Sequence, residues 1–196
     1  MEQPFKPTRE QILAARGKTV PDLIAPGLRV LFCGINPGLY TAAVGHHFAR
    51  PGNRFWPALH RAGFTPGLFS AFEEEKLLPR GYGIVNLVEH ATARADELSA
   101  EDLARGGRGL IEKIRLYRPR FCAVLGLGAY RTAFARPEAT PGPRPEKLGG
   151  VSRLWVLPSP SGINASYPME DLVGLLRELK IAVDREDCCP WPGTCS

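Results

Sequence analysis

Four short runs of apolar residues alternate along the chain with segments of helical periodicity. Each run is rich in β-branched or aromatic residues and is followed by a turn, which predicts a strand. The runs span residues 28–33, 83–88, 121–125 and 154–157. Near-continuous apolar strands separated by helices are typical of a parallel sheet covered on both faces. We therefore expect an α/β fold, a three-layer α/β/α sandwich with a central four-stranded parallel sheet.

The intervening segments carry helix start and stop signals. Ser99 followed by Asp102 resembles a capping box, and Pro119 ends the long helix that it opens. One face of this helix is apolar at Leu103, Leu110, Ile111 and Ile114. Other helices are expected over 53–62, with Asn53 as N-cap, and over 128–134 and 168–180.

The rest of the chain completes a simple domain plan. The Pro- and Gly-rich segment 136–150 is expected to be a loop. We expect one domain over residues 1–180, because a single core reaches this length, and a poorly ordered tail over 181–196. The sequence shows no internal repeat.

Composition narrows the function classes. The chain of 196 residues has a net charge of +5 and a pI near 9.1, which favours an acidic partner such as nucleic acid. It has no apolar stretch of membrane-spanning length and no signal-peptide pattern at its start, so we expect a cytoplasmic protein without membrane contact. The five cysteines do not supply four metal ligands at workable spacing, and we expect no metal and no cofactor.

The candidate chemistry gathers where predicted strands end. Ligands of open parallel sheets bind outside the carboxyl ends of the strands, where segments 34–38, 89–96 and 158–165 fall. The first of these reads Gly-Ile-Asn-Pro-Gly, which holds one neutral amide side chain at the sheet edge, with glycines that permit close approach to a ligand.

Several motifs, in this order and spacing, resemble the mismatch-specific uracil-DNA glycosylases of the thymine-DNA glycosylase family. The resemblance covers about residues 30–180. Its carriers are Gly34-Ile35-Asn36-Pro37-Gly38, Gly45-His46-His47-Phe48, Gly52-Asn53-Arg54-Phe55-Trp56, Asn86-Leu87-Val88-Glu89, Gly106-Gly107-Arg108 and Pro158-Ser159-Pro160-Ser161-Gly162.

The resemblance implies a uracil-DNA glycosylase-like fold and a DNA repair enzyme. Such an enzyme hydrolyses the N-glycosidic bond of a mispaired uracil, or a related base, that is flipped out of duplex DNA. With no lysine placed for lyase chemistry, the reaction is expected to stop at the abasic site. The implied partner is double-stranded DNA, and we expect a monomer.

The resemblance also assigns roles to residues. Asn36 would position the attacking water, with Thr41 near the same water, although an Asn-Pro turn former, taken alone, is the commoner explanation of such an asparagine. Phe48 would stack on the base, unless it is a core aromatic. Main-chain amides around Ile35 and Phe48 would meet the carbonyl oxygens of the base. Asn86 would read the uracil edge or cap the end of the sheet.

A carboxylate would activate water more strongly than an amide does. Two candidates follow the second strand, Glu89 and Asp96. Asp96 is the tentative choice as a catalytic base, because it lies in the loop before Ser99, where it can turn toward the pocket. The alternative is a solvated loop acid. His46 and His47, without an evident acidic partner, are candidates for contacts with phosphate or sugar.

The segment around Ser161, Gly162 and Ile163 matches the family's DNA-insertion loop. Ile163 would be the wedge that fills the gap left by the flipped nucleotide, while Ser161 and Gly162 would bind neighbouring phosphates. Close relatives place an arginine in this loop where this chain has small or neutral residues near Ala165.

Two other readings stay open. One is a broader glycosylase that also acts on single-stranded DNA or on other damaged bases. The other is a non-catalytic nucleic-acid-binding domain in which Gly126-Leu127-Gly128 cradles a phosphate at a helix N-terminus.

Overall fold

A single five-stranded sheet runs through the molecule. The computed structural model describes residues 5–162 and 167–188. The strand order is β2-β1-β3-β5-β4. The strands are β1 Val30–Gly34, β2 Tyr82–Asn86, β3 Phe121–Leu125, β4 Gly142–Leu148 and β5 Ser152–Leu157. Four of them are parallel, as predicted, and β4 pairs antiparallel with β5 at the edge.

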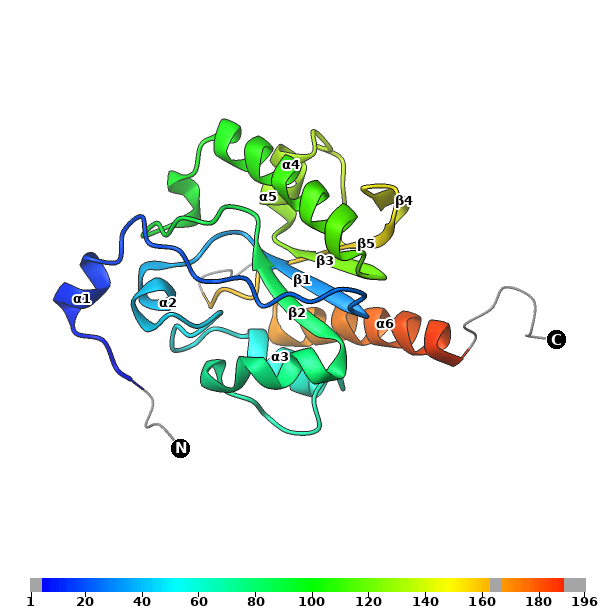
Figure 1. Ribbon diagram of the computed structural model, residues 1–196, viewed down its shortest axis with the longest axis horizontal. Helices are drawn as coiled ribbons and strands as arrows, with labels where there is room; N and C mark the ends of the chain where they lie inside the picture. Colours follow the sequence, from blue (N-terminus) through cyan, green and yellow to red (C-terminus); the bar gives the residue numbers. More distant parts are fainter. Residues whose placement is uncertain (1–4, 163–166, 189–196) are drawn as a thin grey trace.

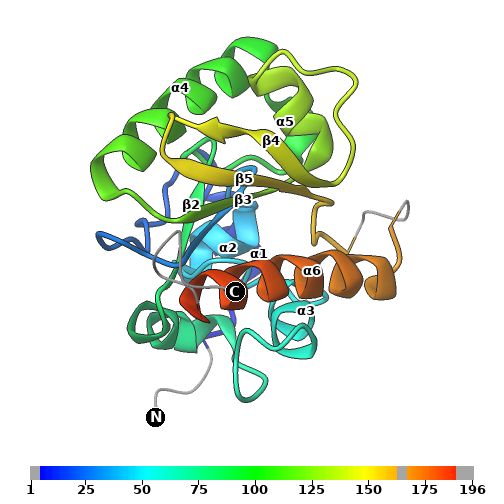
Figure 2. The ribbon, with the colours of Figure 1, turned by 90° about the vertical axis from the view of Figure 1, so that its right-hand side faces the viewer.

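Helices cover both faces of the sheet, which confirms the three-layer α/β/α class (Figures 1 and 2). On one face lie α4 (Ala100–Tyr117) and α5 (Leu127–Ala133), and on the other lie α3 (Phe55–Arg61) and α6 (Met169–Cys188). The shorter elements are α1 (Arg9–Leu13), α2 (Leu39–Val44) and the 3-10 helices η1 (Ala71–Arg80) and η2 (Ala95–Glu97).

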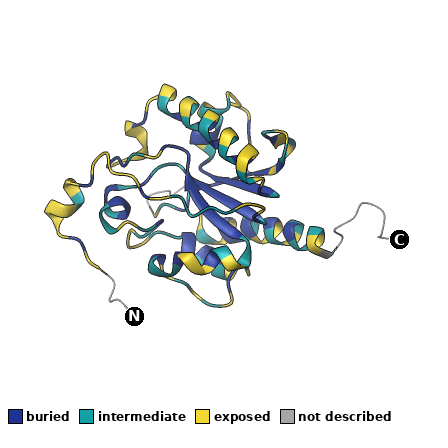
Figure 3. Ribbon diagram, in the orientation of Figure 1, coloured by how far each residue is buried: buried dark blue, intermediate teal, exposed yellow. Residues whose placement is uncertain are grey.

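The parallel part of the sheet is buried on both faces because successive side chains of a strand enter different cores. In β1, Val30 and Phe32 belong to the core beneath α3 and α6, while Leu31 and Cys33 belong to the core beneath α4 and α5. Figure 3 shows the central strands of the sheet in the colour of buried residues, and every residue of β1, β2 and β3 is buried. This two-sided burial explains why the strands read as continuous apolar runs.

The long helix α4 begins as the sequence predicted. The Ser99 hydroxyl accepts from the Asp102 amide at 3.0 Å, and the Asp102 carboxylate accepts in return from Ser99. A Cβ placed on Gly106 would lie 2.2 Å from the Leu87 carbonyl oxygen, so only glycine allows this close packing. The contact fixes α4 against the chain that leaves β2.

Three expectations were wrong in detail. Segment 136–150 contains strand β4, so the sheet has five strands and not four. Helix α6 continues through Cys188, so residues 181–188 are helical and not a tail, and residues 189–196 lie outside the described residues. Helix α3 starts at Phe55 with Arg54 as N-cap, although the Asn53 side chain still accepts from the Phe55 amide at 2.9 Å.

Neither edge of the sheet is a free, regular strand. Along β2, Leu23 forms an antiparallel bridge with Ile84, exchanging two backbone hydrogen bonds of 2.9 and 2.8 Å. At the other edge, β4 carries Pro143 and Pro145, and its pairing with β5 is irregular between Pro143 and Lys147. Across the described part of the chain, no helix has the length and apolarity to cross a membrane.

Candidate active site

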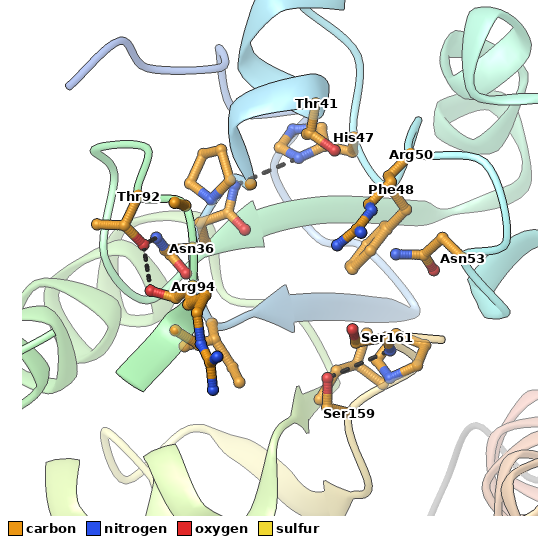
Figure 4. Close-up of a pocket in the computed structure, with 18 of the residues that line it drawn as sticks. Asn36, Thr41, His47, Phe48, Arg50, Asn53, Thr92, Arg94, Ser159 and Ser161 are labelled. Carbon is orange, nitrogen blue, oxygen red and sulfur yellow. Dashed lines mark hydrogen bonds between the residues drawn. The ribbon is translucent and has the colours of Figure 1, made fainter. Parts of the chain in front are cut away.

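A pocket of about 430 Å³ opens at the carboxyl ends of the parallel strands (Figure 4). Most of the site residues predicted from the sequence line it: Ile35, Asn36, Thr41, Phe48, Asn86, Asp96 and Ser161. Gly162 follows the last of these and is exposed, outside the lining, while Ile163 lies outside the described residues. The topology therefore brings together segments that are more than a hundred residues apart in sequence.

The Asn36 side chain is held on one side of the pocket by two hydrogen bonds. Its Nδ2 donates to Thr92 Oγ1 at 2.7 Å and to the His90 carbonyl at 3.2 Å. Thr92 Oγ1 in turn donates to the Arg94 carbonyl at 2.7 Å, so it must accept from Asn36. Since both partners act as acceptors, the amide nitrogen faces them and Oδ1 is left as an acceptor on the opposite side.

The turn that carries Asn36 is fixed to the segment after β2. Val88 donates its amide to the Ile35 carbonyl at 2.8 Å, and Thr92 donates to the Pro37 carbonyl at 3.3 Å. The Ile35 side chain packs over Gly126, where an added Cβ would lie 2.6 Å from its Cγ1. Thr41, in α2, is buried beside this turn. Asn36 is thus both the asparagine of an Asn-Pro turn and a residue that lines the pocket.

Phe48 has the backbone conformation of a residue under constraint. Its φ is +55°, in the left-handed region that non-glycine residues rarely adopt. The ring stacks on Phe55 with centroids 4.1 Å apart and an interplanar angle of 22°. Phe48 therefore packs on the core through Phe55 and also lines the pocket, which combines the two readings of this aromatic.

Asn86 lies at the end of β2 beside a buried imidazole. Its Nδ2 is 3.4 Å from His47 Nδ1, and His47 Nε2 is 2.9 Å from the Pro21 carbonyl oxygen. Only 1% of His47 and 8% of Asn86 is exposed. A Cβ on Gly34 would lie 2.7 Å from Asn86 Oδ1 and 3.2 Å from the Phe48 ring, so the glycine makes room for both side chains.

The two histidines do have an acidic partner, which the sequence did not reveal. Glu74, in η1, is buried and accepts from the His47 backbone amide at 2.8 Å, and its other oxygen is 2.8 Å from His46 Nδ1. Trp56 Nε1 donates to the His47 carbonyl at 3.3 Å. Because the His47 imidazole is buried, it cannot be the phosphate or sugar contact that the sequence suggested.

The two candidate carboxylates lie in different surroundings. Asp96 lines the pocket, but its side chain is 63% exposed and forms two hydrogen bonds with Arg94, at 2.7 and 3.1 Å. The Glu89 carboxylate instead accepts a hydrogen bond from Lys113 Nζ at 2.9 Å. Of the two, only Asp96 reaches the pocket.

The segment after β5 is bound to the Asn53-Arg54 motif. The Arg54 guanidinium donates to the carbonyls of Tyr167 at 2.6 Å, Ser161 at 3.1 Å and Ser159 at 3.4 Å. Its backbone amide donates to the Pro160 carbonyl at 2.9 Å. These contacts join two motifs of the sequence into one wall of the pocket.

Charged groups gather at the mouth of the pocket, where Arg50, Arg94 and Asp96 are all exposed. The interior offers neutral amides, a hydroxyl and an aromatic ring. No group of three or more His, Cys, Asp or Glu side chains among the described residues is arranged to hold a metal ion.

Sequence reasoning missed Glu74, Thr92 and Arg54 as parts of the site, and it gave His47 only as a contact with phosphate or sugar. Thr92 and Glu74 act across long sequence separations, so no local pattern marks them. Arg54 and His47 lie inside the recognised motifs, and that position was the only available signal. The Gly126-Leu127-Gly128 reading loses its main argument, because Gly126 is explained by packing against Ile35 and the following helix has only seven residues.

Comparison with known proteins gives the family and supports the fold. The family model described as the uracil DNA glycosylase superfamily matches residues 21–180. Among solved structures, the chain is similar to the solution NMR structure of a protein from Methanosarcina acetivorans that is provisionally named a uracil DNA glycosylase. The two share 17% sequence identity with a TM-score of 0.52, over 84% of this chain and 98% of the other. At this identity the likeness supports the fold alone.

Proposed function

Since the chain belongs to the uracil DNA glycosylase superfamily, we propose that it removes uracil, above all uracil mispaired with guanine, from duplex DNA. The product is an abasic site, and the enzyme has no lyase step and no cofactor. It acts as a monomer in the cytoplasm. The observation that carries the proposal is the fixed amide of Asn36, with its oxygen free to accept, in a pocket that also contains Phe48 and Asn86.

The reaction suits a site without a strong base. The bond from C1′ of the deoxyribose to the base nitrogen breaks and its electron pair leaves with the uracil, while the water oxygen bonds to C1′ and the proton that the water loses ends on the departing uracil anion. An amide cannot remove a proton from water, so bond breaking must run ahead of attack, through an oxocarbenium-like sugar. Asn36 Oδ1 accepts from the water and aims it, while Thr41 lies near the same place. Fixed dipoles that stabilise the leaving anion supply the main rate effect.

Base recognition falls to the opposite part of the pocket. Phe48 provides a stacking face for the extruded base, backed by Phe55. Asn86 offers a donor and an acceptor to the polar edge of uracil. Main-chain groups around Ile35 and Phe48 meet the carbonyl oxygens of the base.

Contacts with DNA fall to the loop after β5. Ser161 and Gly162 bind phosphates beside the flipped nucleotide, and Ile163 fills the gap in the stack. The hydrogen bonds of Arg54 support this assignment, because the guanidinium binds the carbonyls of Ser161 and Tyr167, which lie before and after Ile163 in the sequence. Because this chain has small or neutral residues near Ala165, no side chain is assigned to a contact with the opposite guanine.

Asp96 is the remaining candidate for activating water. Its exposure and its pairing with Arg94 favour Asn36 as the principal group. Replacing Asn36 by Ala should reduce excision by about 10²–10³-fold, whereas Asp96→Asn should stay within about threefold. A larger loss for Asp96→Asn than for Asn36→Ala would transfer the role to the carboxylate.

The experiment compares excision from labelled duplexes that contain G·U, A·U and G·T pairs, and from single-stranded DNA that contains uracil. Alkali-labile cleavage at uracil, strongest for G·U and lost in Asn36→Ala, is the expected result. Equal rates on every uracil substrate would favour the broader glycosylase. DNA binding without any cleavage would favour the non-catalytic domain.

A further inference from the structure

Hydrogen-bond chemistry determines the tautomer of the buried His47. Its Nε2 lies 2.9 Å from the Pro21 carbonyl oxygen, which can only accept, so Nε2 carries the proton. In a neutral imidazole the other nitrogen, Nδ1, then has a lone pair and can only accept. Its neighbour is the Asn86 amide at 3.4 Å.

The tautomer in turn determines which way the Asn86 amide faces. A lone pair on His47 Nδ1 requires a donor, so the nitrogen of the amide faces the histidine. The oxygen then lies on the other side, over Gly34 and beside the Phe48 ring. If the amide turned over, its oxygen would face the Nδ1 lone pair at close range in a buried site, which is costly because both groups would be unsatisfied.

The imidazole stays neutral because of its surroundings. Burial lowers the pKa of His47 below its ordinary value of 6.5, against the opposing effects of Glu74, the Pro21 carbonyl and Asp22, while His46 acts in the same direction as burial. Glu74 and Trp56 fix the backbone on both sides of the ring, through the His47 amide and carbonyl. The acceptor at Nδ1 is therefore present at neutral pH and held in place.

We propose that His47 is a positioning residue that sets base specificity by fixing the Asn86 amide with its oxygen toward the base. This inference rests on the proposed function and deepens it. An acceptor at this place matches a base that presents a ring N–H, as uracil and thymine do at N3. Cytosine presents a lone pair at N3, which the amide oxygen repels. His47 thus selects the N–H form of the pyrimidine ring without touching it.

Two substitutions of His47 distinguish the role of Nδ1 from the role of Nε2. In His47→Asn, the side-chain oxygen reaches the place of Nδ1 and can still accept from Asn86. In His47→Gln, the amide nitrogen reaches the place of Nε2 and can still donate to Pro21, but the acceptor for Asn86 is lost. Binding of free uracil and free cytosine, followed by NMR titration at pH 7.5, gives the preference for uracil in each variant.

We expect His47→Gln to reduce the preference for uracil over cytosine by about tenfold, the cost of one unsatisfied buried group, and His47→Asn to retain it within about threefold. In an Asn86→Ala background, His47→Gln should change the preference by less than about twofold, because its effect passes through Asn86. Equal losses in the two His47 variants, or a loss that persists in the Asn86→Ala background, would show a merely structural role and overturn the proposal.

A second readout uses the native protein and needs no variant to fold. Because burial holds the pKa of His47 below its ordinary value of 6.5, the imidazole keeps its Nδ1 lone pair as the pH falls from 7.5 to 6.5, and the preference for uracil should stay constant over this range. A preference that declines across this range, with the protein still folded, counts against the proposal. Excision assays run separately: absence of uracil release from DNA would refute the proposed function, whereas the free-base preference tests His47 on its own.

Discussion

The interior of the pocket and its mouth are built from different kinds of group. Inside, Asn36, Asn86 and His47 are uncharged, at least partly buried and held by hydrogen bonds to fixed partners. At the mouth, Arg94 and Asp96 are charged and form an exposed pair, with side chains 73% and 63% exposed. Exposed pairs of this kind contribute little energy and are screened by salt.

The contrast indicates how a pocket lined by neutral groups could support a reaction without a buried charged side chain. Neutral groups whose orientation is fixed before substrate binding need no reorganisation during the reaction, and they act in surroundings that exclude water. The exposed arginines at the mouth, Arg50 and Arg94, suit another task, the attraction of a polyanion, which depends on ionic strength. The following predictions probe the interior first and the mouth last.

Removing the stacking ring should have the largest effect of the three. We expect Phe48→Ala to lower kcat/KM for uracil excision by about 10–100-fold, because stacking of one base on an aromatic side chain contributes about 1–3 kcal/mol. Phe48→Tyr keeps the ring and serves as the matched control, which should stay within about threefold. Similar losses in the two variants would mean that the backbone conformation at this position, and not the stacking, is what matters.

Removing the acceptor that orients Asn36 should have an intermediate effect. Thr92→Val keeps the shape of the side chain but leaves Asn36 Nδ2 without its 2.7 Å partner. We expect kcat to fall about tenfold, because the amide loses the shorter of the two hydrogen bonds that orient it and keeps only the one to the His90 carbonyl, with KM little changed, while Thr92→Ser retains activity. A change confined to KM would indicate that Thr92 serves binding and not the orientation of water.

Removing a charge from the mouth should have the smallest effect. Arg50→Ala should raise KM a few-fold and reduce the salt dependence of DNA binding by about one unit of the log-log slope, as expected for one phosphate contact. Arg61, which pairs with Glu170 in α6 and lies outside the pocket lining, is the control position. If Arg50→Ala reduced kcat instead, the division between mouth and interior would fail.

The sequence predicted the parallel part of the fold because each of those strands is a buried apolar run. It did not predict β4, because Gly142–Leu148 includes two prolines and otherwise mostly polar residues in a Pro- and Gly-rich segment, a composition that indicates a loop. It predicted Asn36, Phe48 and Asn86 at the pocket because they end strands or lie in recognisable motifs. It did not predict the roles of Glu74 and Thr92, since these depend on contacts between segments that only the folded chain brings together.

The arrangement of the sheet edges has a consequence for colloidal behaviour. Strand edges with unpaired backbone groups recruit strands from other molecules, which begins aggregation. Here Leu23 occupies part of the β2 edge, while two prolines and an irregular register interrupt β4. The parallel, apolar strands at the centre of the sheet are therefore protected at both edges from pairing with strands of other molecules. Cross-strand association between intact molecules is disfavoured even at high protein concentration.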